Sequence, residues 1–163
     1  KNLVSVSDYT GQPEMQGGLV KTLDFKIYLG LLSETYNADH VADLKRTKGV
    51  AIDMIVVNLY PFKQTVAQPG VTVEKARTNI DIGGPCMVRA SAKNFLRVAS
   101  VTDPADYGMI IEEMKKSGGT VSLKTRYQLA RKAFTHTAHY DTAISKYLAS
   151  QAYETMKACY KMA

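Results

Sequence analysis

Apolar residues occur along this chain in two kinds of run, which together predict alternating strands and helices. Residues 51–59 form a nearly continuous apolar segment rich in β-branched side chains, as is typical of a strand covered on both faces. Residues 95–101 have the pattern of a second strand, and residues 3–6 that of a shorter one at the start. Helical patterns separate these runs, so we predict an α/β domain with a mostly parallel sheet and helices packed on it.

Residues that cap helices mark where several of the predicted helices begin. Thr72 and Ser122 are suitable N-caps, and Pro104 after Asp103 occupies a favoured first helical position. The helix that begins there is expected to stop at the glycine pair 118–119. The predicted helices cover residues 23–33, 38–47, 72–79, 103–118 and 122–148.

Length and composition indicate one domain of a cytoplasmic protein. The chain has 163 residues, 45% of them hydrophobic, but no apolar run long enough for a membrane span and no signal-peptide pattern. Its two cysteines, Cys86 and Cys159, are too few for a disulfide framework or a zinc site, which favours a reducing compartment.

The net charge of +6 does not by itself indicate a nucleic-acid partner. The 21 basic residues are spread along the chain among 15 acidic ones, and clusters such as residues 45–48 fall near predicted helix C-termini. Solvated helix ends therefore explain the charge better than a groove for nucleic acid. A modest positive field would still attract a phosphorylated metabolite.

A phenol, a carboxylate and an amine follow one another at strand ends and loops. Tyr60 lies at the carboxyl end of the first long strand, and Asp81 and Lys93 flank a glycine-rich turn that can start a helix. Acid–base chemistry on a bound ligand is plausible there. On the residues alone, a core tyrosine and a structural salt bridge between Asp81 and Lys93 are serious alternatives.

Several blocks of the sequence follow one another in the order of a known family. They comprise residues 6–11, 13–15, 20–23, 57–62, 65–67, 70–74, 80–84, 89–90, 92–94 and 132–138. These blocks resemble the inosine monophosphate (IMP) cyclohydrolase domain, which closes the purine ring at the end of purine nucleotide synthesis. The resemblance runs from about residue 4 to about residue 150, so we expect a cyclohydrolase-like domain over 1–150 and a helical extension or tail over 151–163. We expect no second catalytic domain and therefore a stand-alone cyclohydrolase.

The resemblance implies a fold, a reaction and a ligand. The fold would be like that of methylglyoxal synthase, a three-layer α/β/α arrangement. The reaction would join the carboxamide nitrogen of a formamidoimidazole carboxamide ribonucleotide to its formyl carbon and expel water. It requires no metal or other cofactor, and the small-molecule partner is this purine-precursor ribonucleotide. A homodimer is also implied.

The resemblance further assigns roles to individual residues. Lys21 and Thr22 would hold the reacting end of the substrate, and Tyr60 would donate to an oxyanion or carry a proton. Asp81 and Lys93 would assist proton transfer from the carboxamide, so the implied catalytic residues are Lys21, Tyr60, Asp81 and Lys93. The implied substrate-binding groups are Thr22, Asn58 and the backbone N–H groups of Ile82, Gly83 and Gly84. We assign no catalytic role to His136 and expect it to be packed and hydrogen-bonded.

Two departures from the family pattern leave an alternative open. Family members begin about 40 residues earlier, with loops that grip the substrate phosphate. Leu19 stands where the family usually has an arginine, which removes a planar donor group. The alternative is a non-catalytic module of the same fold that senses a purine nucleotide or phosphate. A methylglyoxal synthase proper fits poorly, because its characteristic aspartate and histidine motifs are missing.

Overall fold

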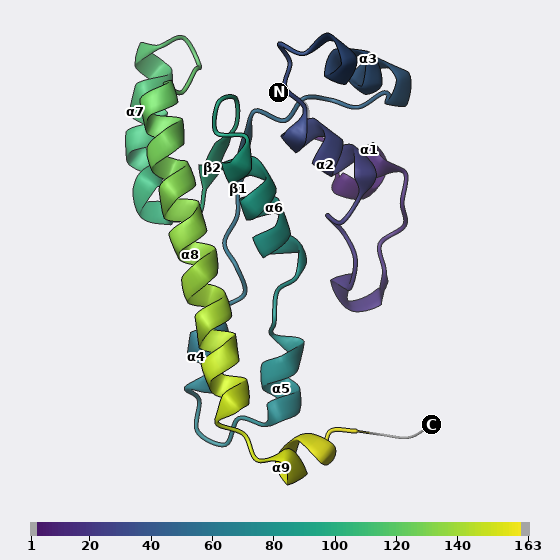
Figure 1. Cartoon of the computed structure of the whole chain (residues 1–163), viewed down its shortest axis with the longest axis vertical. Coiled ribbons are helices and arrows are strands. Elements are labelled where there is room, and N and C mark those ends of the chain that lie inside the picture. The colour runs from purple at the N-terminus through teal and green to yellow at the C-terminus, as the bar shows by residue number, and fades with distance from the viewer. Residues whose placement is uncertain (1–2, 161–163) are drawn as a thin grey trace.

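The structure is a computed structural model that describes residues 3–160. Its longest element, α8 (Leu123–Ala149), runs along the long axis of an elongated molecule (Figure 1). The other elements, in chain order, are α1 (Val6–Thr10), η1 (Gln16–Gly18), α2 (Phe25–Leu32), α3 (Ala38–Thr47), β1 (Met54–Val56), α4 (Phe62–Val66), α5 (Val73–Thr78), α6 (Gly83–Lys93), β2 (Ala99–Val101), η2 (Pro104–Asp106), α7 (Tyr107–Lys116) and α9 (Tyr153–Lys157).

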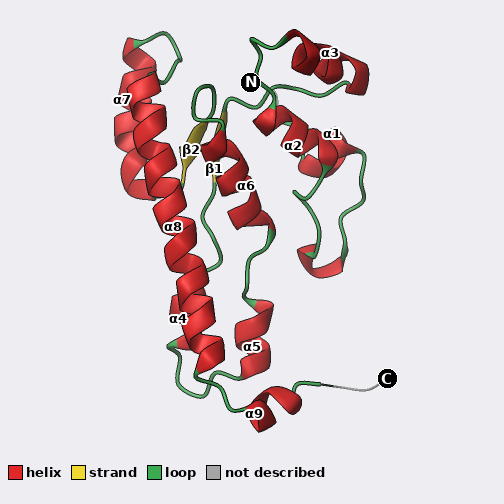
Figure 2. Cartoon of the chain, in the orientation of Figure 1, coloured by secondary structure: helices red, strands yellow, loops and turns green. Residues whose placement is uncertain are grey.

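Within the described residues, β1 and β2 form a small parallel sheet with helices on both faces (Figure 2). Ile55 packs in one core cluster with residues of α2, α6 and α8, and the neighbouring Ser100 hydroxyl bonds to Ser91 of α6 at 2.8 Å. Ala99 and Val101 point the other way, into a cluster with residues of α7 and α8. These contacts confirm the predicted α/β class and its three layers.

Both long strands are shorter than predicted. Strand β1 pairs with β2 from Met54 to Val56, and the N–H of residue 57 adds one bond to the carbonyl of Val101. Residues 94–98 form turns in place of a strand, because the N–H groups of Arg97 and Val98 both donate to the carbonyl of Asn94. In the two-stranded sheet of the described residues β1 can pair only with β2, so the short β2 limits the paired stretch of β1.

The expectation that the first long strand is covered on both faces is also wrong for part of β1. Every residue of β2 is buried, whereas Val56 of β1 is 55% exposed. Helix α8 packs against β2 and leaves the edge of the sheet at Val56 open.

The predicted strand at residues 3–6 is not present. Ser5 instead caps α1, because its hydroxyl accepts the Asp8 N–H at 3.1 Å, and Val6 is already helical. Leu3 is 99% exposed and has no neighbouring strand in the described part of the chain. The Ser–x–x–Asp spacing is itself a local capping signal, and it outweighs the β-propensity of two valines.

The predicted helix starts are confirmed. Thr72 caps α5 and Ser122 caps α8 through bonds from the N–H groups of residues 75 and 125. Asp103 caps the short helix at Pro104–Asp106, and α7 follows at once. After residue 150 the chain forms the separate short helix α9, so it does not continue α8.

Asn94 and the residues around it hold α6 in place, and α6 begins beside the predicted site. The buried Asn94 amide donates to the carbonyls of Leu31 and Ser33 at 2.8 and 3.1 Å, which ties the end of α6 to the end of α2. Helix α6 also packs closely against α8. The start of α6 is therefore fixed relative to the sheet.

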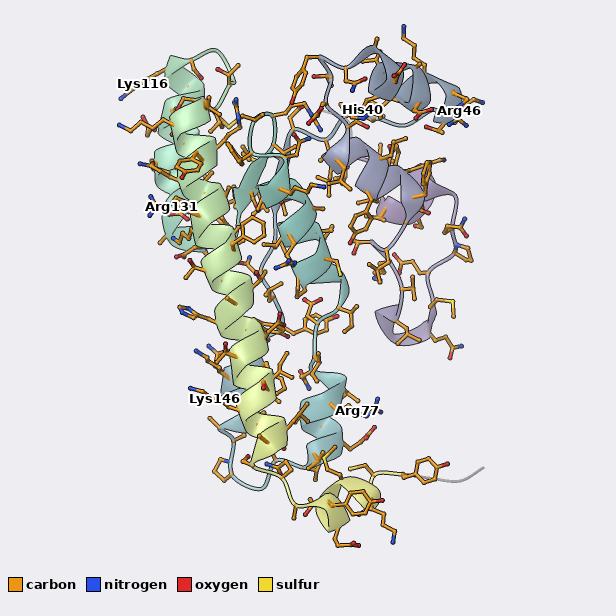
Figure 3. The ribbon with its side chains drawn as sticks, in the orientation of Figure 1. His40, Arg46, Arg77, Lys116, Arg131 and Lys146 are labelled. Atoms are coloured by element: carbon orange, nitrogen blue, oxygen red, sulfur yellow. The ribbon has the colours of Figure 1, made fainter. Side chains whose placement is uncertain are left out.

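The basic side chains labelled in Figure 3 are distributed over several helices. Lys116 is at the end of α7, Arg46 is near the end of α3, and Arg131 and Lys146 are spaced along α8. In the part of the chain that the structure describes, none of the helices combines the length and the apolar character that crossing a membrane requires.

Candidate functional site

A cavity of about 320 Å³ lies between the loop around residues 17–23, the end of β1 and the start of α6. Its volume is at the lower end of the range for small-molecule sites. Three segments that are distant in sequence meet there, as expected at the carboxyl end of a parallel strand. The predicted site residues that line it are Lys21, Thr22, Tyr60, Asp81, Ile82, Gly83 and Gly84.

The carboxylate of Asp81 joins two walls of the cavity. Its Oδ1 accepts the N–H of Gly84 at 2.8 Å, and its Oδ2 lies 3.4 Å from the N–H of Tyr60. The first bond satisfies a free N–H group in the first turn of α6, where a negative charge also complements the helix dipole. Asp81 therefore fixes the loop after β1 against the start of α6.

The two glycines at the start of α6 permit this close approach. A Cβ at Gly84 would lie 2.6 Å from Oδ2 of Asp81 and 2.7 Å from a methyl group of Leu59. A Cβ at Gly83 would lie 2.7 Å from the hydroxyl oxygen of Thr22. Thr22 and the start of α6 thus lie next to each other at this cavity.

Lys21 reaches the cavity from a tight turn. Gly17 and Gly18 both have positive φ angles, 69° and 67°, which glycine adopts without strain. The Lys21 ammonium is 3.1 Å from a carboxylate oxygen of Glu14, and both side chains are about half exposed. Glu14, which the sequence analysis did not single out, lines a neighbouring cavity that shares Lys21.

Two of the predicted residues do not line this cavity. The Asn58 amide instead donates to the Tyr107 hydroxyl at 3.3 Å, on an exposed part of the loop after β1. Lys93 lies in the last turn of α6, at the opposite end of that helix from Asp81, and is exposed. Within residues 3–160 its ammonium group has no ion-pair partner, so no salt bridge joins it to Asp81.

Tyr140 of α8 contacts the backbone of Asp81, and the sequence analysis did not predict this contact. Its hydroxyl accepts the N–H of Asp81 at 2.9 Å and lies 3.3 Å from the carbonyl of Asn79. Burial is the main cause that raises the pKa of the Tyr140 phenol, so it keeps its proton at neutral pH. Helical spacing with Ala133 and Thr137 places Tyr140 on the buried face of α8, but spacing alone names no partner.

His136 is only partly as expected. It is half-buried, and burial is the main cause that lowers the pKa of its imidazole. However, its Nε2 is buried without a hydrogen-bond partner in the described structure, which corrects the expectation of a hydrogen-bonded histidine. His136 and Tyr60 both line a separate cavity of about 350 Å³ behind the loop after β1.

The described residues contain no cluster of three or more histidine, cysteine, aspartate or glutamate side chains that could hold a metal ion. The chemistry available in the cavity comes from an ammonium, a phenol, a carboxylate and the N–H groups of a helix start. Such a set can orient a polar heterocycle and move protons on it.

Two family models match consecutive parts of the chain. The MGS-like domain matches residues 2–86, and the AICARFT/IMPCHase bienzyme matches residues 91–163. The chain belongs to the MGS-like domain family, which agrees with the fold described above. The bienzyme match continues past residue 150, where the resemblance was expected to fade.

Curated relatives give a more particular likeness. The chain is 52% identical over 154 residues to the bifunctional purine biosynthesis protein PurH of Synechococcus sp. (strain CC9605), covering 94% of this chain and 29% of that protein. It is 53% identical over 148 residues to PurH of Neisseria meningitidis serogroup A, covering 91% and 28%. The chain thus spans less than a third of the length of these relatives.

A solved structure supports the same fold. The crystal structure of ForH superposes with a TM-score of 0.74 at 31% sequence identity, and the match covers 88% of this chain and 74% of that one.

Proposed function

We propose that this chain carries out the IMP cyclohydrolase step of purine biosynthesis, closing the ring of 5-formamidoimidazole-4-carboxamide ribonucleotide with loss of water. One observation carries the proposal: Lys21, Tyr60 and Asp81, from three separate segments, line one cavity. The match to the bienzyme family and the high identity to PurH proteins support it.

In the proposed reaction, the carboxamide nitrogen attacks the formyl carbon and a new C–N bond forms. The nitrogen loses a proton while the formyl oxygen gains negative charge. Lys21 stabilises this oxyanion, since an ammonium is more effective in a site from which the ligand excludes water. Asp81, together with Lys93, assists removal of the nitrogen's proton.

The second half of the proposed reaction releases water. The former formyl oxygen takes up two protons in all and leaves as water with the electron pair of its bond to carbon. The nitrogen that carried the formyl group loses its proton, and the electron pair of that N–H bond forms the new C=N double bond. Tyr60, which is half-exposed and lines the cavity, supplies a proton to the leaving oxygen. Thr22 and the N–H groups of Gly83 and Gly84 orient the carboxamide and its oxygen.

Lys93 enters this scheme from the resemblance, because it does not line the cavity. Helix α6 has 11 residues, about 16 Å of helix at ~1.5 Å per residue. In a helix each Cα–Cβ bond tilts towards the N-terminal end, which for Lys93 is the end of α6 next to Asp81. In the proposal it contacts the substrate from beyond the cavity.

One observation favours the alternative, a module that binds a nucleotide without turnover. Leu19 lines the cavity and is 77% exposed, at the position where the resemblance leads one to expect an arginine. The site therefore lacks one cation that would recognise a phosphate or a carboxamide oxygen.

The appearance of the inosine chromophore separates the two functions. The purified chain is incubated with the formamido ribonucleotide, and absorbance of the product is followed against the same chain carrying Asp81→Ala. We expect substrate-dependent product with the unaltered chain and a much lower rate with the variant. If calorimetry shows that IMP binds to the chain but no product forms, the result contradicts the proposed enzyme and supports the sensing module.

A further inference from the structure

Tyr140, in the middle of α8, reaches the backbone of the residue proposed to move the carboxamide proton. Its hydroxyl oxygen is 2.9 Å from the amide nitrogen of Asp81 and 3.3 Å from the carbonyl oxygen of Asn79. A phenol can accept one hydrogen bond and donate another, so it satisfies both groups at once. The hydroxyl therefore bridges two points of the segment that leads into α6.

Packing fixes the position of this hydroxyl. Tyr140 is 9% exposed, and its ring meets Phe62 of α4 edge to face, with centroids 6.3 Å apart and planes at 66°. Phe62 is almost fully buried and also contacts Ala76 of α5 in the same cluster. The phenol is thus packed among α4, α5 and α8. It has little freedom to move with the segment that contains Asp81.

Asp81 is then held from two sides. Tyr140 fixes its backbone N–H, while its carboxylate accepts the N–H groups of Gly84 and Tyr60. The bond to Tyr60 is long, at 3.4 Å, so a small displacement of the Asp81 backbone would break it. Such a displacement would also change the distance between the carboxylate and the Tyr60 loop.

We propose that Tyr140 is a positioning residue of this site: its hydroxyl holds the Asp81 backbone so that the carboxylate lies between Tyr60 and the start of α6. The inference rests on the proposed function for its catalytic consequence. Its structural part, the hydrogen bond to the Asp81 N–H, is measurable without turnover. The ordinary pKa of a tyrosine is about 10 and burial raises that of Tyr140, so at neutral pH the phenol keeps the proton that it donates to the Asn79 carbonyl.

Tyr140→Phe tests this role, with Tyr147→Phe as the matched control. Tyr147 lies two turns further along α8 and meets the same Phe62 ring edge to face, with centroids 5.8 Å apart. In the part of the chain that the structure describes, its hydroxyl makes no hydrogen bond. Each substitution removes one oxygen from a ring packed on Phe62, and Tyr140→Phe alone removes a contact with Asp81.

The first readout is amide hydrogen exchange at Asp81, followed by NMR in the 163-residue chain. We expect Tyr140→Phe to speed exchange of the Asp81 amide about tenfold or more, while Tyr147→Phe leaves it unchanged. An Asp81 amide that exchanges at the same rate in both variants would overturn the inference, whatever the activity of the chain.

The second readout is the split between kcat and KM. We expect Tyr140→Phe to lower kcat about tenfold with KM nearly unchanged, and Tyr147→Phe to keep both values. If the unaltered chain is active and Tyr140→Phe has the same kcat, the positioning role is wrong and the proposed function stands. A chain with no turnover at all, but with the expected exchange at Asp81, would overturn the proposed function and leave the contact established.

Discussion

The backbone N–H of Tyr60 lies 3.4 Å from Oδ2 of Asp81, so the loop after β1 and the start of α6 meet at one carboxylate. The same carboxylate accepts the N–H of Gly84 through its other oxygen. Asp81 thus has a structural role as the acceptor of two backbone hydrogen bonds. Its proposed chemical role, as a charged group that assists removal of a proton, is separate. Substitutions can separate the two.

Asp81→Asn is expected to keep the fold and lose the reaction. An asparagine oxygen still accepts the Gly84 N–H, but the amide carries no charge and takes up no proton at neutral pH. We expect turnover to fall on the order of a hundredfold, with the thermal midpoint close to that of the unaltered chain. Asp81→Ala should show the same loss and a lower midpoint, because the Gly84 N–H loses its partner. Near-normal turnover in Asp81→Asn would remove the carboxylate from the mechanism.

Lys93→Ala tests the residue that the resemblance implies but that does not line the cavity. We expect turnover to fall on the order of a hundredfold and stability to change little, because the exposed ammonium has no ion-pair partner in the described part of the chain. Lys116→Ala, at the exposed end of α7, is the control and should keep full turnover. If the two variants have equal steady-state rates, Lys93 lies outside the site in solution as well.

Gly84→Ala is expected to disturb both stability and turnover. The added Cβ would lie 2.6 Å from the Asp81 carboxylate, so either the carboxylate or the helix start must shift, at a cost of about 1–3 kcal/mol. Gly108→Ala in α7 is the matched control. Apart from its chain neighbours and the backbone of its own helix, no atom lies within 4 Å of a Cβ at that position, and alanine should stabilise the helix by about 0.5–1 kcal/mol. Chemical denaturation measures both, and a neutral Gly84→Ala would contradict the crowding at the cavity.

Leu19→Arg is expected to tighten ligand binding. Leu19 lines the cavity and is largely exposed, so a guanidinium can occupy the position without displacing core residues. We expect the Kd for IMP to fall several-fold, about 1 kcal/mol, with a stronger dependence on salt concentration. Leu148→Arg, at the far end of α8, serves as the control and should leave the Kd unchanged. Equal affinities for both variants would place the ligand away from Leu19.

The burial of His136 predicts how stability depends on pH. Burial lowers the pKa of this imidazole in the folded state, so protons bind more readily to the unfolded chain. The stability that the neutral imidazole contributes is fully present above its unfolded pKa of about 6.5, and it is lost as pH falls towards the folded value. We expect His136→Gln to reduce the fall in thermal midpoint between pH 7 and pH 5. A His136→Gln variant whose midpoint falls as steeply as that of the unaltered chain would contradict the account.

Helix starts were predictable because capping is local. Thr72 and Ser122 each accept an N–H three residues ahead, and that geometry depends on a few neighbouring residues. Ser5 follows the same rule, and the strand predicted at residues 3–6 is wrong because the cap starts α1 at Val6.

The length of a strand and the set of residues that line the cavity depend on distant parts of the chain, so both were less predictable. The end of β1 is set by its pairing with β2, some 45 positions away in the register Met54 to Ala99. The motif residues Lys21, Tyr60 and Asp81 do line one cavity, but the resemblance could not reveal the position of Lys93 outside it. The contact from Tyr140 to Asp81 spans 59 positions, and no local pattern encodes such a bond.

The most direct test of the central claim is to locate bound IMP on the chain by titration, with the backbone amide signals followed by NMR. The account predicts that IMP causes the largest changes in amide chemical shift at residues 18–23 and 81–84. It also predicts that these changes are smaller in Asp81→Asn and Lys21→Ala. Shifts confined to another surface, such as the cavity beside Arg77 and Cys159, with residues 18–23 and 81–84 unmoved, would contradict it.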